Sequence, residues 1–151
     1  MSDAIFTQSV EVRWADLDAN QHMRHSAYAD LCTHARLGWL SHHGFAGQDF
    51  ARLGLGPVLF QESTDYFREV HLGERLEISL RLEAATPDYG RWKIRQDMHK
   101  ADGSLAATHR VYGAWLNLAE RKLAPPSAGL MAIFASLARV DFSSLPQPQY
   151  Q

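Results

Sequence analysis

The chain has 151 residues, of which 46% are hydrophobic and 21% charged, and its formal net charge is −2. This length suits one domain, and the composition is typical of a globular protein. The slightly acidic balance offers no basic field, so we expect no nucleic-acid partner. Cys32 is the only cysteine, which excludes an intrachain disulfide and favours a reducing, cytoplasmic location.

The sequence gives no sign of a membrane partner. No apolar run approaches the ~20 residues that a membrane-spanning helix needs, and residues 1–6 lack the basic and apolar segments of a signal peptide. We expect a single domain over residues 1–140. Residues 141–151 are rich in Ser, Pro and Gln and predict a loose C-terminal tail.

The first part of the chain predicts a strand followed by a long helix. Residues 5–14 form a run of β-branched and aromatic residues that is typical of a strand. Residues 26–43 predict a helix, with Ser26 as its N-cap and Gly44 just beyond its end, where a left-handed backbone costs glycine little. Its apolar residues recur at three- and four-residue steps and make one face: Tyr28, Leu31, Cys32, Ala35 and Trp39.

The rest of the chain predicts four strands and a short helix, at residues 58–70, 76–83, 91–98, 104–118 and 126–137. Apolar and polar side chains alternate in the second and third of these strands, as in strands with one buried face. Residues 101–103 end in Gly103, which suits a hairpin turn before the last strand.

This order of elements predicts an α+β fold. A lone long helix must bury its apolar face against something, and the antiparallel strands offer one apolar face. We therefore expect an antiparallel sheet of about five strands wrapped around one long central helix. Such a sheet leaves outer edges, which a homodimer or homotetramer would cover.

The chemically informative segment lies between the first strand and the long helix. Two carboxylates, two imidazoles and an amide fall within ten residues: Asp16, Asp18, Asn20, His22 and His25. They precede a helix N-terminus, where free backbone N–H groups attract negative charge. A plain structural interpretation remains open, in which Asp18 and Asn20 only form turns before the helix.

Two metal interpretations are weaker. The spacing from Asp16 resembles the opening of a calcium loop, but Gln21 stands where that loop needs Gly and Ala27 where it needs Glu. A transition-metal site from Asp18, His22 and His25 would lack the usual framework of spaced Cys and His residues. We therefore expect no metal.

The segment resembles the signature of the 4-hydroxybenzoyl-CoA thioesterase-like family, whose fold is the hotdog fold. The residues in register with the signature are Arg13, Trp14, Asp16, Asp18, His22 and Tyr28. The similarity extends from Val10 to about Leu137 through further landmarks: Pro57-Val58, Asp65-Tyr66-Phe67-Arg68, Leu72-Gly73-Glu74, and Arg121-Lys122 before Pro125-Pro126.

The resemblance implies an acyl-CoA thioesterase in which Asp18 is the catalytic carboxylate, as nucleophile or as general base. It places the backbone N–H of His25 in the oxyanion hole, with the His25 side chain as a possible catalytic assistant. The substrate-binding positions are His22, Arg24, Tyr28, Glu62 and Ser63. It implies no cofactor, because CoA enters as part of the substrate, and it implies sites at a subunit interface.

Departures from the family pattern keep other functions open. Many relatives carry Gly at the position of Gln21 and Asn or an aromatic residue at that of Arg24, which could instead meet a substrate carboxylate or a CoA phosphate. Asp18, Asn20 and His22 also resemble the Asp-x-Asn-Pro-x-His pattern of hotdog enoyl-thioester hydratases and dehydratases, although the His comes one residue early and the Pro is missing. A non-catalytic acyl-binding module is a further alternative.

Overall fold

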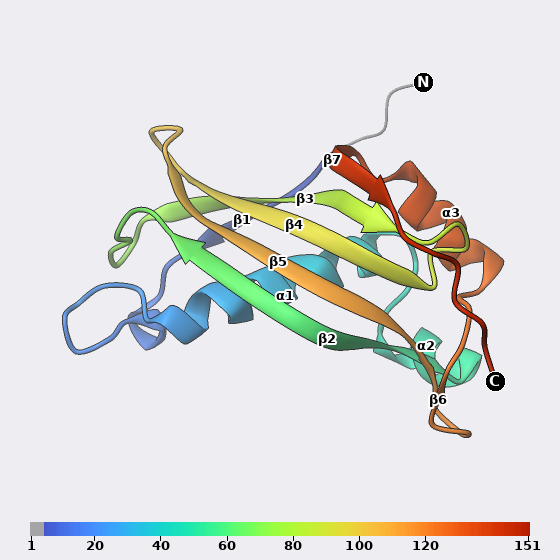
Figure 1. The fold of residues 1–151 in the computed structure, drawn as a ribbon. Coiled ribbons are helices and arrows are strands. Elements are labelled where there is room, and N and C mark those ends of the chain that lie inside the picture. Colours follow the sequence, from blue (N-terminus) through green and yellow to red (C-terminus); the bar gives the residue numbers. More distant parts are fainter. Residues whose placement is uncertain (1–4) are drawn as a thin grey trace.

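The computed structural model describes residues 5–151, so the first four residues of the expected domain lie outside the described part. One curled sheet of seven strands carries the fold, and its main path runs β1-β3-β4-β5-β2 with all neighbours antiparallel (Figure 1). These strands are β1 Phe6–Glu11, β2 Leu55–Tyr66, β3 Arg75–Ala85, β4 Arg91–Lys100 and β5 Leu105–Asn117. The predicted α+β class is confirmed, and β2 lies at one edge of the path.

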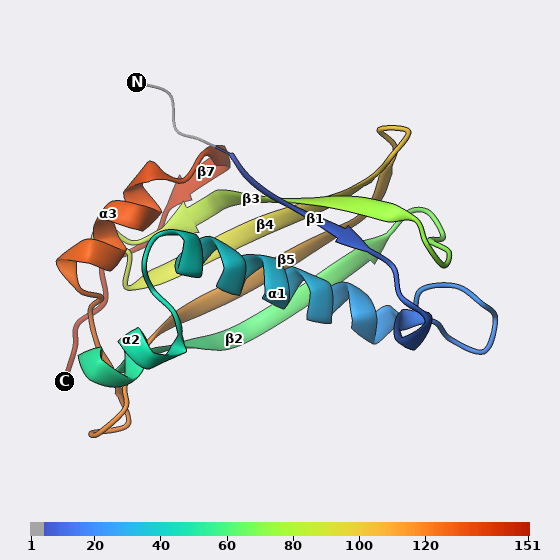
Figure 2. The same ribbon diagram turned by 180° about the vertical axis from the view of Figure 1, so that it is seen from behind.

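The longest helix, α1 (His25–His42), crosses one face of the sheet (Figure 2). All five residues of its predicted apolar face are buried: Tyr28, Leu31, Cys32, Ala35 and Trp39. The facing side chains of β3 are fully buried as their alternation predicts: Leu76, Ile78, Leu80 and Leu82. No helix within residues 5–151 combines the length and apolar character needed to cross a membrane.

The C-terminal end of α1 was predicted correctly from the sequence, but its N-terminal end was not. Ser26 is wrong as the N-cap, because the helix already begins at His25 and Arg24 occupies the cap position. The Ser26 hydroxyl instead accepts a hydrogen bond from the Arg24 side chain. Gly44 follows the C-cap with φ of +90°, which confirms the expected left-handed residue.

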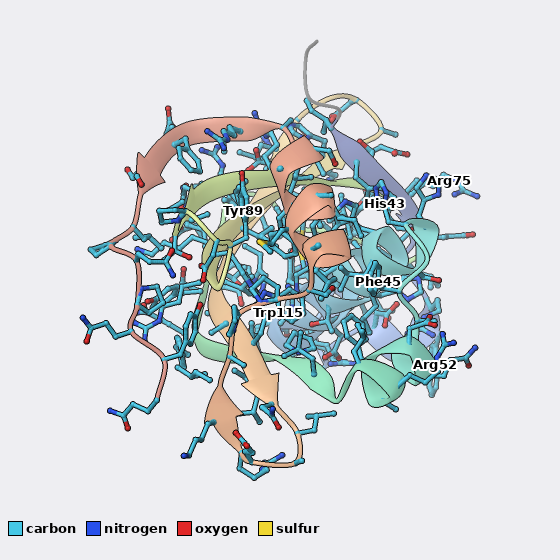
Figure 3. The ribbon with its side chains drawn as sticks, turned by 90° about the vertical axis from the view of Figure 1, so that its right-hand side faces the viewer. His43, Phe45, Arg52, Arg75, Tyr89 and Trp115 are labelled. Atoms are coloured by element: carbon cyan, nitrogen blue, oxygen red, sulfur yellow. The ribbon has the colours of Figure 1, made fainter. Side chains whose placement is uncertain are left out.

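The expectation of one central helix with a second short one is incomplete, since residues 5–151 form three α-helices. Besides α1 there are α2 (Gly47–Leu53) and α3 (Ala128–Ser136), which lie at the same end of the sheet (Figure 2). An aromatic cluster that includes Trp115 (Figure 3) fills this end beneath them. Trp115 stacks on Phe50 at 6.1 Å and meets Phe134 at 5.7 Å between ring centroids. Such pairs contribute about 0.5–1.5 kcal/mol each beyond their buried area.

The C-terminal segment is not a loose tail over its whole length. Residues Arg139–Ser144 form β7, which pairs in parallel with residues 82–85 of β3. It therefore lies on the same edge of β3 as β1, beyond the end of β1. Further on, Gln147 and Tyr150 each donate a hydrogen bond of 2.7 Å to the Asp88 carboxylate. A short strand, β6 (Lys122–Leu123), pairs with β5.

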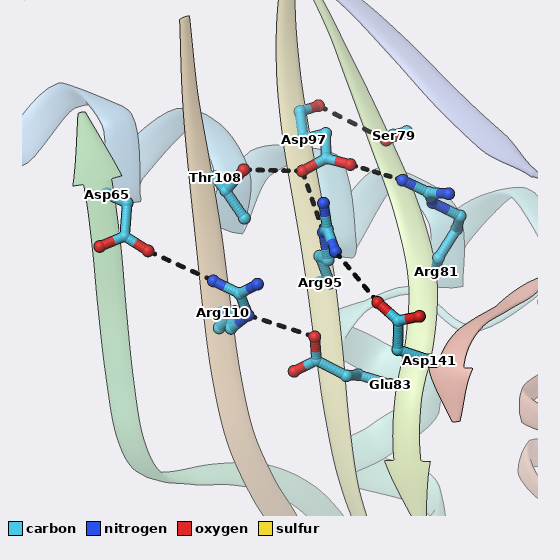
Figure 4. A network of polar contacts seen from close by, with 9 residues as sticks. All are labelled: Asp65, Ser79, Arg81, Glu83, Arg95, Asp97, Thr108, Arg110 and Asp141. Atoms are coloured by element: carbon cyan, nitrogen blue, oxygen red, sulfur yellow. Dashed lines mark hydrogen bonds and ion pairs between the residues drawn. The ribbon is translucent and has the colours of Figure 1, made fainter. Parts of the chain in front are cut away.

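A polar network covers the face of the sheet opposite α1 (Figure 4). At its centre the Asp97 carboxylate, only 3% exposed, accepts hydrogen bonds from Thr108 at 2.8 Å, from Arg95 Nε at 3.1 Å and from Arg81. Burial alone would raise the pKa of Asp97, but these donors outweigh it and the net pKa is lowered. Arg110 bridges Glu83 and Asp65 beside this centre.

Candidate active site

The loop between the 3-10 turn Trp14–Asp16 and α1 fixes the carboxylate of Asp18. Its Oδ1 accepts hydrogen bonds from the backbone N–H groups of Asn20, at 2.8 Å, and His22, at 3.1 Å. Among the described residues no donor contacts Oδ2. The loop closes through the Asp18 N–H to His22 carbonyl bond of 2.8 Å, with Gln21 at φ +65°. One carboxylate oxygen is therefore held by hydrogen bonds, while the other is available to react.

Asp16 holds this loop in place through hydrogen bonds of its side chain and its carbonyl group. Its side chain is buried and accepts from the Arg13 backbone N–H at 2.9 Å and from the Arg13 guanidinium at 2.9 and 3.1 Å. These hydrogen bonds lower the pKa of Asp16 despite its burial. Its carbonyl accepts the Arg24 N–H at 2.7 Å, so Asp16 positions the loop and takes no part in the pocket.

A pocket of about 380 Å³ brings four of the expected site residues together. Asp18, His22, His25 and Tyr28 line it from the loop and the first turn of α1. The opposite wall comes from the end of β2 and the residues after it: Tyr66, Phe67, Arg68 and Glu69. The two walls touch where the rings of Tyr28 and Tyr66 meet edge-on at 4.9 Å.

The N-terminus of α1 opens beside this pocket. No described side chain caps it, because the N-cap residue Arg24 makes no such hydrogen bond. First-turn N–H groups without helical partners carry partial positive charge. His25, whose backbone N–H is expected to donate to an oxyanion, is one of the residues that line the pocket, and the Tyr66 hydroxyl donates to its carbonyl at 3.4 Å.

Arg24 lies outside the pocket lining in this chain. Its Nε donates to the Ala15 carbonyl at 3.3 Å, and its Nη1 contacts Ser26 and, at 3.4 Å, Asp30. This arrangement joins the loop to the first turns of α1. The Arg24 side chain thus contacts other residues of the loop and helix, not the pocket.

Glu62 and Ser63 are not brought to Asp18 within one chain. They line a separate pocket of about 160 Å³ near the middle of β2. The Glu62 carboxylate lies 3.6 Å from Nε2 of the fully buried His109, whose Nδ1 meets the Thr64 hydroxyl at 2.7 Å. Burial, followed by the charge of Arg36, lowers the pKa of His109 to about 4, so this imidazole is neutral at physiological pH.

Three pocket residues were missed as site residues: Met23, Arg68 and Glu69. Tyr66 and Phe67, which the sequence left open between an acyl pocket and the core, line the pocket as well. The segment from Asp65 to Arg68 matched a family landmark, so a signal for part of this wall was present in the sequence. Glu69 had no such signal, because long-range contacts bring its segment to the loop, among them the bond from the Met23 N–H to the Val70 carbonyl at 2.7 Å.

The group best able to hold a metal differs from the one considered in the sequence. It consists of His22, Glu69 and His71, whose ligand atoms all lie within 4.8 Å of one another. Asp18 and His25 are not part of it. The Asp16 carboxylate, the first position of the calcium-loop spacing, is fully engaged by Arg13.

Comparison with known proteins places the chain in a family. Residues 12–134 match the model of the thioesterase-like superfamily, which is most of the chain. No curated protein matches the sequence.

Solved structures share the fold over nearly the whole chain. A Staphylococcus aureus hypothetical protein in complex with CoA is 22% identical, with a TM-score of 0.82 over 93% of this chain and 90% of that one. A 1,4-dihydroxy-2-naphthoyl-CoA thioesterase from Synechocystis is 25% identical, with a TM-score of 0.80 over 89% and 98%. A DHNA-CoA thioesterase from Staphylococcus aureus is 20% identical, with a TM-score of 0.73 over 80% of each chain. The chain belongs to the thioesterase-like superfamily, as its resemblance to the 4-hydroxybenzoyl-CoA thioesterase-like hotdog proteins indicated, and thioester hydrolysis is the class of reaction to which that membership assigns it.

Proposed function

We propose that this protein hydrolyses an acyl-CoA thioester to a free carboxylic acid and CoA, with Asp18 as the catalytic carboxylate. One observation carries the proposal: Asp18 and His25, the first residue of the uncapped helix α1, line the same pocket. The family match supports the reaction class, and the similar Staphylococcus aureus structure that binds CoA supports CoA as the carrier. The buried free thiol of Cys32 is compatible with a cytoplasmic location.

The geometry of Asp18 suits either nucleophilic attack on a thioester carbonyl or removal of a proton from an attacking water molecule. Because two N–H groups hold Oδ1, the carboxylate keeps one orientation, and Oδ2 accepts no hydrogen bond from the described residues. A positioned carboxylate can act as nucleophile: it attacks the carbonyl carbon, the C–S bond breaks and the CoA thiolate leaves, and water then cleaves the mixed anhydride. Alternatively it acts as general base for a water molecule that attacks the carbonyl and displaces the CoA thiolate directly. Either route builds negative charge on the thioester oxygen.

The start of α1 supplies the complement to that charge. The His25 N–H stands at the helix N-terminus, where the partial positive charge stabilises an oxyanion. The His25 side chain also lines the pocket and is a candidate to assist, while His22 and Tyr28 shape the acyl or pantetheine path. No metal or redox cofactor enters these steps.

A screen for thiol release decides between this proposal and its alternatives. Purified protein is incubated with short, long and aryl acyl-CoAs, and free CoA is followed with a thiol reagent. A thioesterase releases thiol from saturated substrates. A hydratase or dehydratase would instead remove enoyl absorbance without thiol release, and an acyl-binding module would bind acyl-CoA without turnover.

The complete site requires a second copy of the chain in our proposal. Strand β2 is an open edge, and Leu59, Phe60 and Tyr66 on it are exposed in the single chain. Two-fold pairing of this edge with itself is antiparallel and would bring the Tyr66 end of one β2 beside the Pro57 end of the other. Such pairing would add Glu62 and Ser63 of a second copy to the interface, where the family resemblance places them.

The same pairing suggests where the acyl group goes. Pro57 and Leu59 border an apolar pocket of about 220 Å³ that Trp92, Trp115 and Phe134 also line. In the dimer this pocket of one protomer would adjoin the Asp18 pocket of the other. An apolar pocket beside the reacting carbonyl suits a hydrophobic acyl chain or aryl group.

We expect the native protein to have at least twice the chain mass of 17.0 kDa by light scattering. Replacing both Leu59 and Phe60 with Asp should yield monomers, because two charged side chains on this edge strand would have to lie in the interface between the copies. Ile5→Asp, an equally exposed apolar position by the opposite edge strand, is the matched control and should leave the mass unchanged. A wild-type monomer with full turnover would refute the interface site.

A further inference from the structure

The loop before α1 and the segment after β2, which together line the Asp18 pocket, also contact each other through His22, Glu69 and His71. The Met23 N–H to Val70 carbonyl bond of 2.7 Å sets these segments side by side. Around it, His22 Nε2 lies 3.3 Å and His71 Nε2 4.0 Å from the Glu69 carboxylate oxygen, and the two imidazole rings are 5.1 Å apart. Two ring nitrogens and one carboxylate oxygen therefore lie within 4.8 Å of one another.

These separations fit a divalent transition-metal ion. Ligand atoms around a tetrahedral ion with bonds of about 2.0–2.1 Å are about 3.3 Å apart. The His22–Glu69 pair already has this spacing, and the exposed His71 and Glu69 side chains can close the rest by small rotations. Imidazole with carboxylate selects ions such as Zn²⁺ over Mg²⁺, which prefers oxygen ligands.

A second observation points to a ligand on His71. Its other ring nitrogen, Nδ1, lies 3.3 Å from the Glu74 carboxylate, which is itself held by the His71 backbone N–H at 2.7 Å and by Lys100 at 3.1 Å. Metal-binding histidines characteristically donate their second N–H to such a carboxylate, which fixes the tautomer and raises the basicity of the ligating nitrogen. With the proton on Nδ1, the lone pair of Nε2 is free on the side of Glu69.

We infer that His22, Glu69 and His71 form a binding site for Zn²⁺ or a similar ion, oriented by Glu74, and that the ion slows turnover. The ion would tie together two walls of the pocket, since His22 and Glu69 both line it and the His22 N–H holds the Asp18 carboxylate. Its positive charge at the rim would also draw the Asp18 carboxylate away from the thioester. The inhibitory part rests on the proposed function, whereas the binding part does not.

Binding is measured first, by calorimetric titration of the whole chain with Zn²⁺ and by the visible absorption of Co²⁺. Wild type should bind one ion per chain, His71→Ala should weaken the affinity at least about tenfold, and Glu74→Gln about tenfold. His34→Ala, which removes an exposed imidazole on α1, is the matched control and should bind as wild type does. Equal affinity in His71→Ala and wild type, or equal affinity for Mg²⁺ and Zn²⁺, would overturn the site.

Two further arms separate this inference from the catalytic proposal. Asp18→Asn should bind Zn²⁺ as tightly as wild type, and loss of its binding would move the ion away from the inferred ligands. In the thiol-release assay, Zn²⁺ should slow wild type and leave His71→Ala unaffected. Full turnover of Zn²⁺-loaded wild type would overturn the regulatory role, and absence of any turnover without metal would count against the proposed function alone.

Discussion

Replacing Asp18 with Ala or Asn is expected to lower kcat for acyl-CoA hydrolysis by at least about a hundredfold, the usual scale for a positioned acid–base group. The two variants separate charge from structure. An Asn side chain can keep its amide oxygen where Oδ1 accepts the N–H groups of Asn20 and His22, so the loop survives while the open carboxylate oxygen is lost. Stopped assays of thiol release, with thermal unfolding of each variant, measure both effects.

The matched control for Asp18→Asn is Asp102→Asn. Asp102 is also an exposed carboxylate in a turn whose Oδ1 accepts a backbone N–H two residues on, from Ser104 at 2.9 Å. It lies in the β4–β5 hairpin and lines none of the pockets described above. Its replacement should leave kcat within about twofold of wild type, since it lacks any role in acid–base chemistry. Near-normal turnover of Asp18→Asn would exclude Asp18 as the catalytic group.

The parts of the fold that the sequence predicted are those whose pattern is long and local. Apolar residues recur along α1 from Tyr28 to Trp39, and apolar and polar residues alternate along β3 from Leu76 to Glu83, so the sequence predicted one buried face in each element. Helix α2 has only seven residues, too few for a period to show. Strand β7 is polar, and only its pairing with residues 82–85 of β3, more than fifty positions earlier, makes it a strand.

The candidate site likewise has a part set by local contacts, which the sequence predicted, and a part set by long-range contacts, which it did not. Asp18 and His22 belong to one short loop that is closed by hydrogen bonds spanning two to four residues, so the motif alone predicted their neighbourhood. The positive φ of Gln21 also accounts for Gly at this position in many relatives, because a left-handed backbone favours glycine. Glu69 and His71 reach the loop through a long-range backbone bond that no local pattern records.

Asp97→Ala is expected to reduce the free energy of unfolding by about 2–4 kcal/mol. Removing one partner of a buried ion pair costs about 3–5 kcal/mol when the other charges stay buried. Arg81 and Arg95 retain partial exposure of 26% and 21%, so water offsets part of this cost. The Thr108 hydroxyl, however, is buried and loses its acceptor.

Asp65→Ala is the matched control, because Asp65 pairs with Arg110 on the same face of the sheet but is 61% exposed. Exposed pairs contribute less than about 1 kcal/mol, so urea denaturation at neutral pH should separate the two variants clearly. The pH dependence gives an independent check. Because the folded-state pKa of Asp97 is below its ordinary value of 3.8, its carboxylate stabilises the fold fully above that pH and progressively less as the pH falls through the lowered pKa. The stability gap between wild type and Asp97→Asn should therefore narrow only in that acidic range, and a gap that already closes near neutral pH would show that another group titrates instead.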